Sequence, residues 1–158
     1  MSPEFYFDQL MRYSNFARDY GDNRLFRVAV GANVDDYNWT ETMMRVAGDK
    51  LDGVSLHYYV HPAGGWPPRA PAVDFDENGW ADALNGAMHM DELITKHSAI
   101  MDKYDPKKRV FLAVDEWGSW YAPPPGAPVA ALYQQNSLRD ALVAAININI
   151  FARHADRV

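Results

Sequence analysis

Three short apolar runs alternate with longer segments of helical periodicity, and this alternation limits the folds open to the chain. The runs cover residues 25–30, 52–59 and 110–114, and each leads into polar or aromatic residues. Runs this short predict buried strands, whereas apolar residues spaced three or four apart predict helices. Parallel strands need long crossovers, usually helices, so the order α–β–α–β–α–β–α predicts an α/β fold with a parallel three-stranded sheet. The predicted helices cover residues 3–20, 39–47, 80–104 and 133–155.

A parallel sheet of three strands leaves both of its edges unpaired. The helical segments at the two ends of the chain are also too apolar for helices that are covered on one side only. In the last segment one broad side is mostly apolar, which predicts a long, mostly buried helix. The chain is either an unusually small open sheet or part of a barrel, which needs eight strands, and the apolar end helices favour a partial (β/α)8 TIM barrel. The residues on that broad side are Leu138, Leu142, Ala145, Ile146, Asn149 and Ile150.

Composition and charge exclude several kinds of protein and partner. With 48% hydrophobic residues the chain is able to bury a core, which excludes a disordered protein. The net charge is −6 and the longest basic cluster is residues 107–109, so nucleic acid and anionic membrane surfaces are poor partners. The chain has no cysteine, which excludes disulfides and thiolate chemistry. No apolar run approaches the length of a membrane-spanning helix.

Two carboxylates, Asp115 and Glu116, directly follow the apolar run 110–114. In a parallel α/β barrel the catalytic groups lie at the carboxyl ends of the strands, so this position favours a catalytic role. The residues alone leave an alternative open, because either acid can also cap a turn or pair with an arginine. Asp35 and Asp36 differ from this pair, because they precede a predicted helix and are expected to cap it.

Two long loops interrupt the alternation. Residues 61–78 are rich in proline and glycine and contain Trp66, and loops of this length in a compact domain usually carry function or cover a site. Residues 122–128 are rich in proline, which excludes a helix or a central strand there.

Several longer motifs occur in order along the chain: GANVDDYNWTE at 31–41, VSLHYY at 54–59, VDEWGSWY at 114–121, LYQQNSLRDALVAA at 132–145 and HADRV at 154–158. Together they resemble glycoside hydrolase family 51, the α-L-arabinofuranosidases, over essentially the whole chain. The resemblance implies a retaining enzyme that hydrolyses terminal non-reducing α-L-arabinofuranosyl groups. In that family a catalytic (β/α)8 barrel is joined to a β-sandwich. The three predicted strands would be barrel strands five, six and seven, so residues 1–158 are expected to be a partial barrel domain without the C-terminal β-sandwich.

The resemblance also implies roles for individual residues. Glu116 matches the nucleophile, which attacks the anomeric carbon as a carboxylate, and Asp115 is expected to support it. Tyr59 matches a tyrosine that hydrogen-bonds near the nucleophile and the sugar, and Trp120 matches an aromatic residue that stacks on the leaving sugar. Packing alone is the alternative for both. His57 either orients its neighbours and the substrate or is a hydrogen-bonded core residue.

Other residues are expected to have structural roles. Trp117 is expected to pack and Asn33 to serve a turn. The remaining histidines show no metal-ligand spacing with carboxylates, so surface or core roles are expected, and the sequence implies neither a metal nor a cofactor. These histidines are His61, His89, His97 and His154.

Retaining hydrolysis needs a second carboxyl group about 5–5.5 Å from the nucleophile. In the family this general acid/base belongs to a Gly-Asn-Glu motif at the end of strand four, and that motif does not occur in this sequence. We therefore expect the chain alone to be inactive. Two alternatives stay open: another retaining glycosidase of the same barrel clan, and a non-catalytic sugar-binding α/β module. The His-Tyr-Tyr and Asp-Glu-Trp contexts favour the arabinofuranosidase.

The resemblance also implies partners and a location. The expected partner is an arabinofuranosyl-containing oligosaccharide or polysaccharide, which connects the chain with L-arabinose metabolism. Family members are often homo-oligomers and, in bacteria, often cytoplasmic, so the full-length enzyme is expected to share both properties. The lack of cysteine agrees with a reducing compartment.

Overall fold

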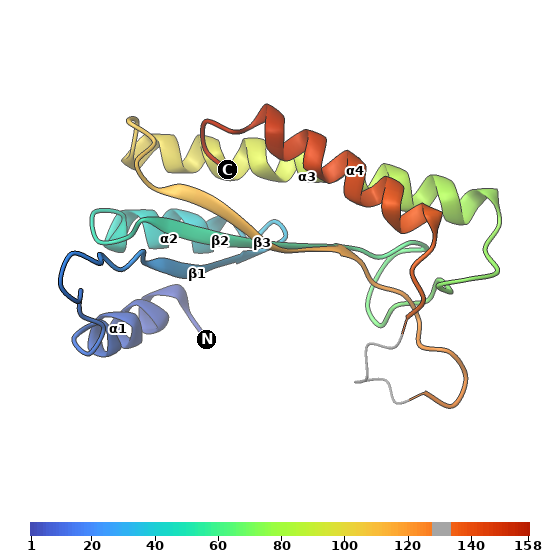
Figure 1. The fold of residues 1–158 in the computed structure, drawn as a ribbon, viewed down its shortest axis with the longest axis horizontal. Helices are drawn as coiled ribbons and strands as arrows, with labels where there is room; N and C mark the ends of the chain where they lie inside the picture. Colours follow the sequence, from blue (N-terminus) through green and yellow to red (C-terminus); the bar gives the residue numbers. More distant parts are fainter. Residues whose placement is uncertain (128–133) are drawn as a thin grey trace. The chain divides into compact units, whose positions relative to one another are not determined.

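The computed structural model describes residues 1–127 and 134–158, and its helices and strands follow the predicted order (Figure 1). They are α1 (Pro3–Ser14), β1 (Val28–Asn33), α2 (Tyr37–Ala47), β2 (Gly53–Val60), α3 (Glu77–Tyr104), β3 (Phe111–Ser119) and α4 (Leu138–Arg153). The chain divides into two compact units, so that β2, α3 and β3 each begin in one unit and end in the other. The first unit comprises Met1–His57, Leu93–Asp115 and Ala155–Val158, and the second comprises Tyr58–Glu92 and Glu116–His154.

The strands form one parallel sheet in the order β1-β2-β3, as predicted (Figure 1). In the first unit, the Phe111 N–H donates to the Asp52 carbonyl at 3.0 Å. In the second unit, the Trp120 N–H donates to the Val60 carbonyl at 2.9 Å. Residue numbers rise in the same direction along both strands, which is the pattern of a parallel pair. The carboxyl ends of β2 and β3 therefore lie at the same edge of the sheet.

β1 starts at Val28 and continues to Asn33, three residues beyond the predicted end of this strand. Gly31 explains the extension. Its N–H donates to the Ser55 hydroxyl at 2.9 Å. A Cβ atom at this position would lie 1.5 Å from the Ser55 carbonyl oxygen. Only glycine allows so close an approach of the two strands. The register between β1 and β2 shifts at this point, between Ala29 and Ala32.

The core of the first unit forms between the sheet and helices α2 and α3. Asp36 caps the start of α2, because its carboxylate accepts the Trp39 N–H at 3.0 Å, so the predicted capping role of Asp36 is confirmed. The apolar positions of α2 recur at helical spacing, and the side chains that they place inward are shielded from water. The largest fully buried apolar residues of this unit are Met43, Val54, Leu56, Leu93, Ile94, Met101, Val110 and Leu112.

Arg157 closes the first unit from the carboxyl-terminal segment. Its side chain is 1% exposed, and its Nη1 atom donates to Asp105 Oδ2 at 3.3 Å and to the Val110 carbonyl at 2.7 Å. The Nη2 atom pairs with Asp102. A buried guanidinium is tolerated only when it is paired and hydrogen-bonded, and Arg157 meets this requirement through the turn between α3 and β3.

Arg139 plays the corresponding part in the second unit. It is fully buried, and its guanidinium lies 3.5 Å from the ring centre of Phe75 and 4.2 Å from that of Tyr121. It also donates to the carbonyl groups of Pro71 at 3.0 Å and Gly79 at 3.3 Å. Arg139 of α4 therefore connects the segment from Pro71 to the first turn of α3 with Tyr121, which follows β3.

α1 ends at Ser14, six residues before the predicted end at Tyr20. The helical spacing of aromatic residues continues past this point, but Phe16 and Tyr20 are 82% and 86% exposed. Short helices in water depend on a packed face, and here the chain offers none. The Ser14 hydroxyl also donates to the Leu10 carbonyl at 2.6 Å in the last turn.

The last helix differs from its prediction in length and in burial. Its predicted start, Tyr133, lies outside the described residues, and α4 runs from Leu138 to Arg153. The Ser137 N–H donates to the Asp140 carboxylate at 2.7 Å, which satisfies a free donor at the helix start. The prediction that one broad side of this helix is buried was wrong, because Leu138 and Leu142 are 68% and 39% exposed. The residues that α4 buries form a narrow stripe: Arg139, Val143, Asn147 and Ile150.

No helix among residues 1–127 and 134–158 combines the length and the apolar character that crossing a bilayer requires.

Asp105 gives the first unit a stability that depends on pH. Burial alone would raise the pKa of this carboxyl group, but hydrogen bonds from the Val110 and Arg109 N–H groups and from the Arg109 and Arg157 side chains lower it below its ordinary value of 3.8. A carboxyl group with a lower pKa in the folded than in the unfolded state stabilises the fold above the unfolded pKa. That stabilisation is lost as the pH falls through the folded pKa.

We predict that D105N lowers the free energy of unfolding at neutral pH by about 3 kcal/mol, because the Arg157 guanidinium loses its buried partner. Below pH 4 the difference between D105N and the parent chain shrinks. Denaturant unfolding followed by circular dichroism across this pH range measures both effects. D49N, at an exposed turn, is the matched control. A D105N protein that loses stability with acid as steeply as the parent would contradict the assignment.

Candidate active site

Glu116 and Tyr59 form a hydrogen-bonded pair in the second unit, in the carboxyl-terminal halves of β3 and β2. Burial raises the pKa of the Tyr59 hydroxyl, and the negative charge of Glu116 and the hydrogen bond to that carboxylate raise it further. The phenol therefore stays protonated at neutral pH and donates to the carboxylate. Glu116 is exposed, so a solute can reach the carboxylate.

Asp115, the residue before Glu116, has a different partner in the first unit. Its Oδ1 atom lies 3.1 Å from the Nε2 atom of His57, and the two side chains are 52% and 30% exposed. A pair this exposed contributes little to stability but orients both groups. Of the predicted site residues, the second unit brings together Glu116, Tyr59 and Trp120, whereas His57 pairs with Asp115 in the first.

The backbone of His57 is tied to the turn that follows β1. Val34 has φ +57°, which is rare for a β-branched residue, and its N–H donates to the His57 carbonyl at 2.9 Å. The Val34 carbonyl accepts from His97 Nε2 at 2.8 Å, and the Thr40 hydroxyl lies 2.8 Å from His97 Nδ1. His97 is fully buried, and burial lowers its pKa. It is a neutral core residue, which confirms the role expected for it.

Aromatic side chains surround Trp120 in the second unit. Its ring centre is 5.4 Å from that of Tyr59 and 5.1 Å from that of Trp66, both edge to face. His61 stacks on Trp120 at 6.2 Å with an interplanar angle of 23°. Burial lowers the pKa of His61, which favours the neutral ring. The length of the loop that contains Trp66 predicts that it carries function or covers a site. Residue order does not indicate that Trp66 and His61 contact Trp120.

Gly118 allows the backbone to turn between the two tryptophans of this segment. It has φ +137°, a backbone conformation that residues other than glycine rarely adopt. On one side of it, Trp117 packs edge to face against Phe151 of α4, with ring centres 5.2 Å apart, so the predicted packing role of Trp117 is confirmed. On the other side, Trp120 joins the aromatic cluster with Tyr59.

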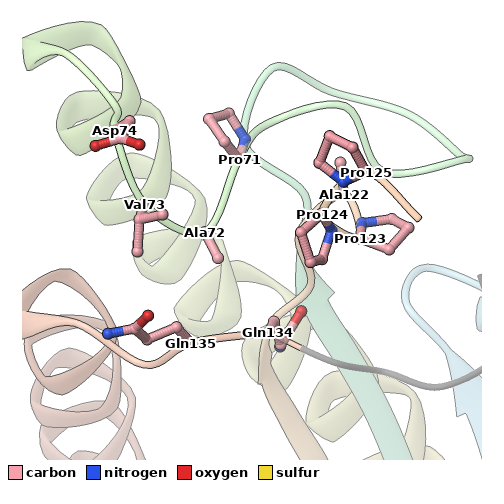
Figure 2. A pocket seen from close by; sticks show the side chains of 10 residues that line it. All are labelled: Pro71, Ala72, Val73, Asp74, Ala122, Pro123, Pro124, Pro125, Gln134 and Gln135. Carbon is pink, nitrogen blue, oxygen red and sulfur yellow. The ribbon is translucent and has the colours of Figure 1, made fainter. Parts of the chain in front are cut away.

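Two cavities of the second unit border the end of β3 and the segment that follows it. One, of about 530 Å³, adjoins Tyr59 and is lined by polar side chains that include Asn136 and Asp140. The other, of about 390 Å³, lies between residues 71–74 and the prolines of residues 122–125 (Figure 2). Within the described part of the chain, no group of three histidine or carboxylate side chains is placed to hold a metal ion.

Sequence comparison relates this chain to arabinofuranosidases. The family described as "Alpha-L-arabinofuranosidase C-terminal domain" matches residues 115–158. A protein of Bacteroides ovatus named intracellular exo-alpha-L-arabinofuranosidase is 41% identical over 159 residues, which cover 100% of this chain and 30% of that protein. A Streptomyces lividans protein named intracellular exo-alpha-(1->5)-L-arabinofuranosidase is 29% identical over 76% of this chain and 18% of its own length.

Structure comparison agrees over the whole chain. The crystal structure of the GH51 arabinofuranosidase from Xanthomonas axonopodis pv. citri matches with a TM-score of 0.96 and 54% identity, covering 100% of this chain and 32% of that one. A family 51 α-L-arabinofuranosidase from Bifidobacterium longum, at 24% identity, shares the fold with a TM-score of 0.72. The chain spans about a third or less of the length of these relatives.

The pairing of Tyr59 with Glu116 is testable by tyrosine titration. We predict that E116Q lowers the pKa of Tyr59, because the amide removes a negative charge beside the phenolate. Isotope-labelled tyrosine NMR follows each hydroxyl separately. D115N is the matched control, because Asp115 pairs with His57 and is expected to leave the Tyr59 titration unchanged. Equal shifts in E116Q and D115N would show that Tyr59 senses net charge rather than its own partner.

Proposed function

The chain is related over its whole length to the glycoside hydrolase family 51 α-L-arabinofuranosidases, and we propose that it carries the nucleophile of such an enzyme, Glu116. The observation that supports this role most directly is the hydrogen bond from Tyr59 to the Glu116 carboxylate, in the carboxyl-terminal halves of two parallel strands. The substrate class is the terminal non-reducing α-L-arabinofuranosyl group, as the names of the relatives suggest.

In this proposal Glu116 acts by nucleophilic displacement. Its carboxylate oxygen bonds to the anomeric carbon while the bond from that carbon to the leaving oxygen breaks, and a second carboxyl group donates a proton to that oxygen. Water then attacks the anomeric carbon of the arabinosyl-enzyme and gives its proton to the second group. Arabinose leaves with retained configuration, and the Glu116 carboxylate is regenerated.

Tyr59 and Trp120 prepare the site for this reaction. A neutral tyrosine hydroxyl donates to the carboxylate and holds it in one orientation for attack. The Trp120 ring, partly exposed beside Tyr59, offers an apolar face to the leaving sugar. His57 contributes from the first unit, where its pair with Asp115 supports the residue that precedes the nucleophile.

The second carboxyl group belongs to the remainder of the enzyme in this proposal. The chain is then strands five to seven of a (β/α)8 barrel. Three observations support the barrel: the helices that separate parallel strands, the apolar side chains of Val28 and Val30 exposed on β1, and those of Leu138 and Ile148 exposed on α4. Further strands would cover these surfaces.

The wider expectations follow from the same relationship. The enzyme would release arabinose from arabinose-containing polysaccharides and oligosaccharides, and it would act inside the cell, as the names of the relatives state for those proteins. A homo-oligomer of the full-length enzyme is part of the proposal. The role needs no metal or cofactor, because both catalytic groups are carboxyls.

The nucleophile is tested in a complete barrel. We place these 158 residues in the Xanthomonas axonopodis enzyme in place of its matching segment and assay an aryl α-L-arabinofuranoside. E116A is expected to lower kcat by roughly a thousandfold or more, because no other group forms the glycosyl-enzyme. D115N, which alters only the supporting pair, is expected to lose far less. Activity that survives E116A in an active parent chimera would refute the nucleophile assignment.

Chemical rescue separates a lost nucleophile from a damaged fold. Azide enters the space left by the Glu116 side chain, so E116A with azide should form an arabinofuranosyl azide of inverted anomeric configuration. The parent chimera should form only the retained product. An E116A variant that stays folded but gives no azide product would argue against direct attack by Glu116.

The chain by itself distinguishes the remaining alternatives. We expect the 158 residues alone to show no measurable turnover of the aryl arabinofuranoside, because the second carboxyl group is supplied elsewhere. Robust hydrolysis by the chain alone would mean that another acid, such as Asp115, completes the pair. A chimera that binds the sugar but turns it over neither with nor without Glu116 would favour a non-catalytic binding module.

A further inference from the structure

Gln134 holds the peptide groups on both sides of Trp120. Its Nε2 atom donates to the Ser119 carbonyl at 2.9 Å, and its Oε1 atom accepts the Tyr121 N–H at 2.9 Å. A glutamine amide has a carbonyl acceptor and N–H donors in one plane, so it can donate and accept side by side as a strand backbone does. Gln134 therefore makes the hydrogen bonds that a neighbouring strand would make to Ser119 and Tyr121, on either side of Trp120.

The Ser119–Trp120 peptide group is also held from the opposite side. The Trp120 N–H donates to the Val60 carbonyl at 2.9 Å, so Trp120 is placed between the end of β2 and the Gln134 amide. Tyr121 is anchored as well: its ring is 2% exposed, its hydroxyl donates to Asp140 at 2.7 Å, and the Arg139 guanidinium lies over its face. The backbone on the carboxyl side of Trp120 is therefore held firmly.

On the amino side of Trp120, one peptide group carries both supports: its N–H donates to Val60 and its carbonyl accepts from Gln134. Gly118, at φ +137°, is two residues before Trp120 and has no side chain that packs against a neighbour. Rotation about this glycine would carry the Ser119 peptide group and the Trp120 ring with it. The donation from Gln134 to the Ser119 carbonyl opposes that rotation together with the Trp120 N–H bond to Val60, because rotating the peptide group removes the carbonyl's partner.

We propose that Gln134 is a positioning residue that sets the orientation of the Trp120 ring and thereby the affinity for the leaving sugar. This inference rests on the proposed function, in which Trp120 contacts that sugar. Gln134 does not touch the reacting atoms, so its effect appears where a leaving sugar is present and is small where the leaving group is too small to reach the ring.

The test compares two substrates in the chimera described above. Arabinobiose has a sugar leaving group, whereas methyl α-L-arabinofuranoside has none that can stack on a ring. We expect Q134A to lower kcat/KM for arabinobiose by roughly five- to thirtyfold through a higher KM, because two hydrogen bonds are lost. For the methyl glycoside the change should stay within about twofold. Equal losses on both substrates would overturn the inference, because they indicate general damage to the fold.

A double-mutant cycle shows whether Gln134 acts through Trp120. In a W120A background, Q134A should change kcat/KM for arabinobiose by no more than about twofold, since the ring that it positions is absent. Additive losses would overturn the inference. Q135A is the matched control, because Gln135 is exposed and borders the same cavity as Gln134 (Figure 2), and it should behave like the parent.

A conservative variant adds a readout that depends on hydrogen bonding. The carboxylate of Q134E accepts the Tyr121 N–H but cannot donate to the Ser119 carbonyl, so at neutral pH Q134E should resemble Q134A. A protonated carboxyl group has a donor and an acceptor again, so the arabinobiose KM of Q134E relative to the parent should fall as the pH is lowered. A ratio independent of pH would contradict the role of the donated hydrogen bond.

Failure of the inference is distinguishable from failure of the proposed function. If E116A leaves activity unchanged, the proposed function is wrong and the inference falls with it. If E116A abolishes activity but Q134A matches the parent on arabinobiose, only the inference is wrong. In the 158-residue chain itself, the Gln134 side-chain NH2 group should exchange with deuterium more slowly than that of Gln135. Equal exchange would show that Gln134 does not hold the backbone around Trp120, independently of any activity assay.

Discussion

The buried guanidinium group of Arg139 is the constraint on which the second unit depends. Moving a charge out of water is costly unless hydrogen bonds or rings replace the water. Among the described residues no carboxylate pairs with Arg139, so the carbonyls of Pro71 before α3 and of Gly79 in its first turn, and the rings of Phe75 and Tyr121, take that part. Meeting this requirement places Tyr121, five residues after Glu116, and with it the segment that carries Trp120.

The two neighbouring acids of β3 show how adjacent residues acquire different chemistry. Asp115 pairs with an imidazole in the first unit, and Glu116 accepts from a neutral phenol in the second. A histidine partner can share a proton with its carboxylate, whereas a tyrosine with a raised pKa can only donate a hydrogen bond near neutral pH. The acid proposed as nucleophile is therefore the one whose partner is a neutral hydroxyl that donates to it.

Local pattern was enough to predict the elements, but it did not predict where all of them end. Capping by Asp36 and the packing of Trp117 followed from their positions in the sequence, and the structure confirms both. The predicted end of α1 and the predicted burial of α4 were wrong, because both depend on whether another surface covers an apolar face. β3 continues through Asp115 and Glu116 to Ser119, although two charges suggested an end at Val114. Backbone pairing with β2, rather than side-chain polarity, sets its length.

The candidate site divides in the same way. Sequence by itself determined the α/β order, the parallel sheet and the motif that marks Glu116, Tyr59, Trp120 and His57, because periodicity and residue order are properties of the chain alone. Tertiary structure decided the partners: Tyr59 for Glu116, His57 for Asp115, and Trp66 and His61 beside Trp120. It also decided that Gln134 holds the backbone around Trp120. These contacts join segments that are distant in sequence, and hydrogen bonds and ring contacts depend on distance and angle in space, which residue order does not specify.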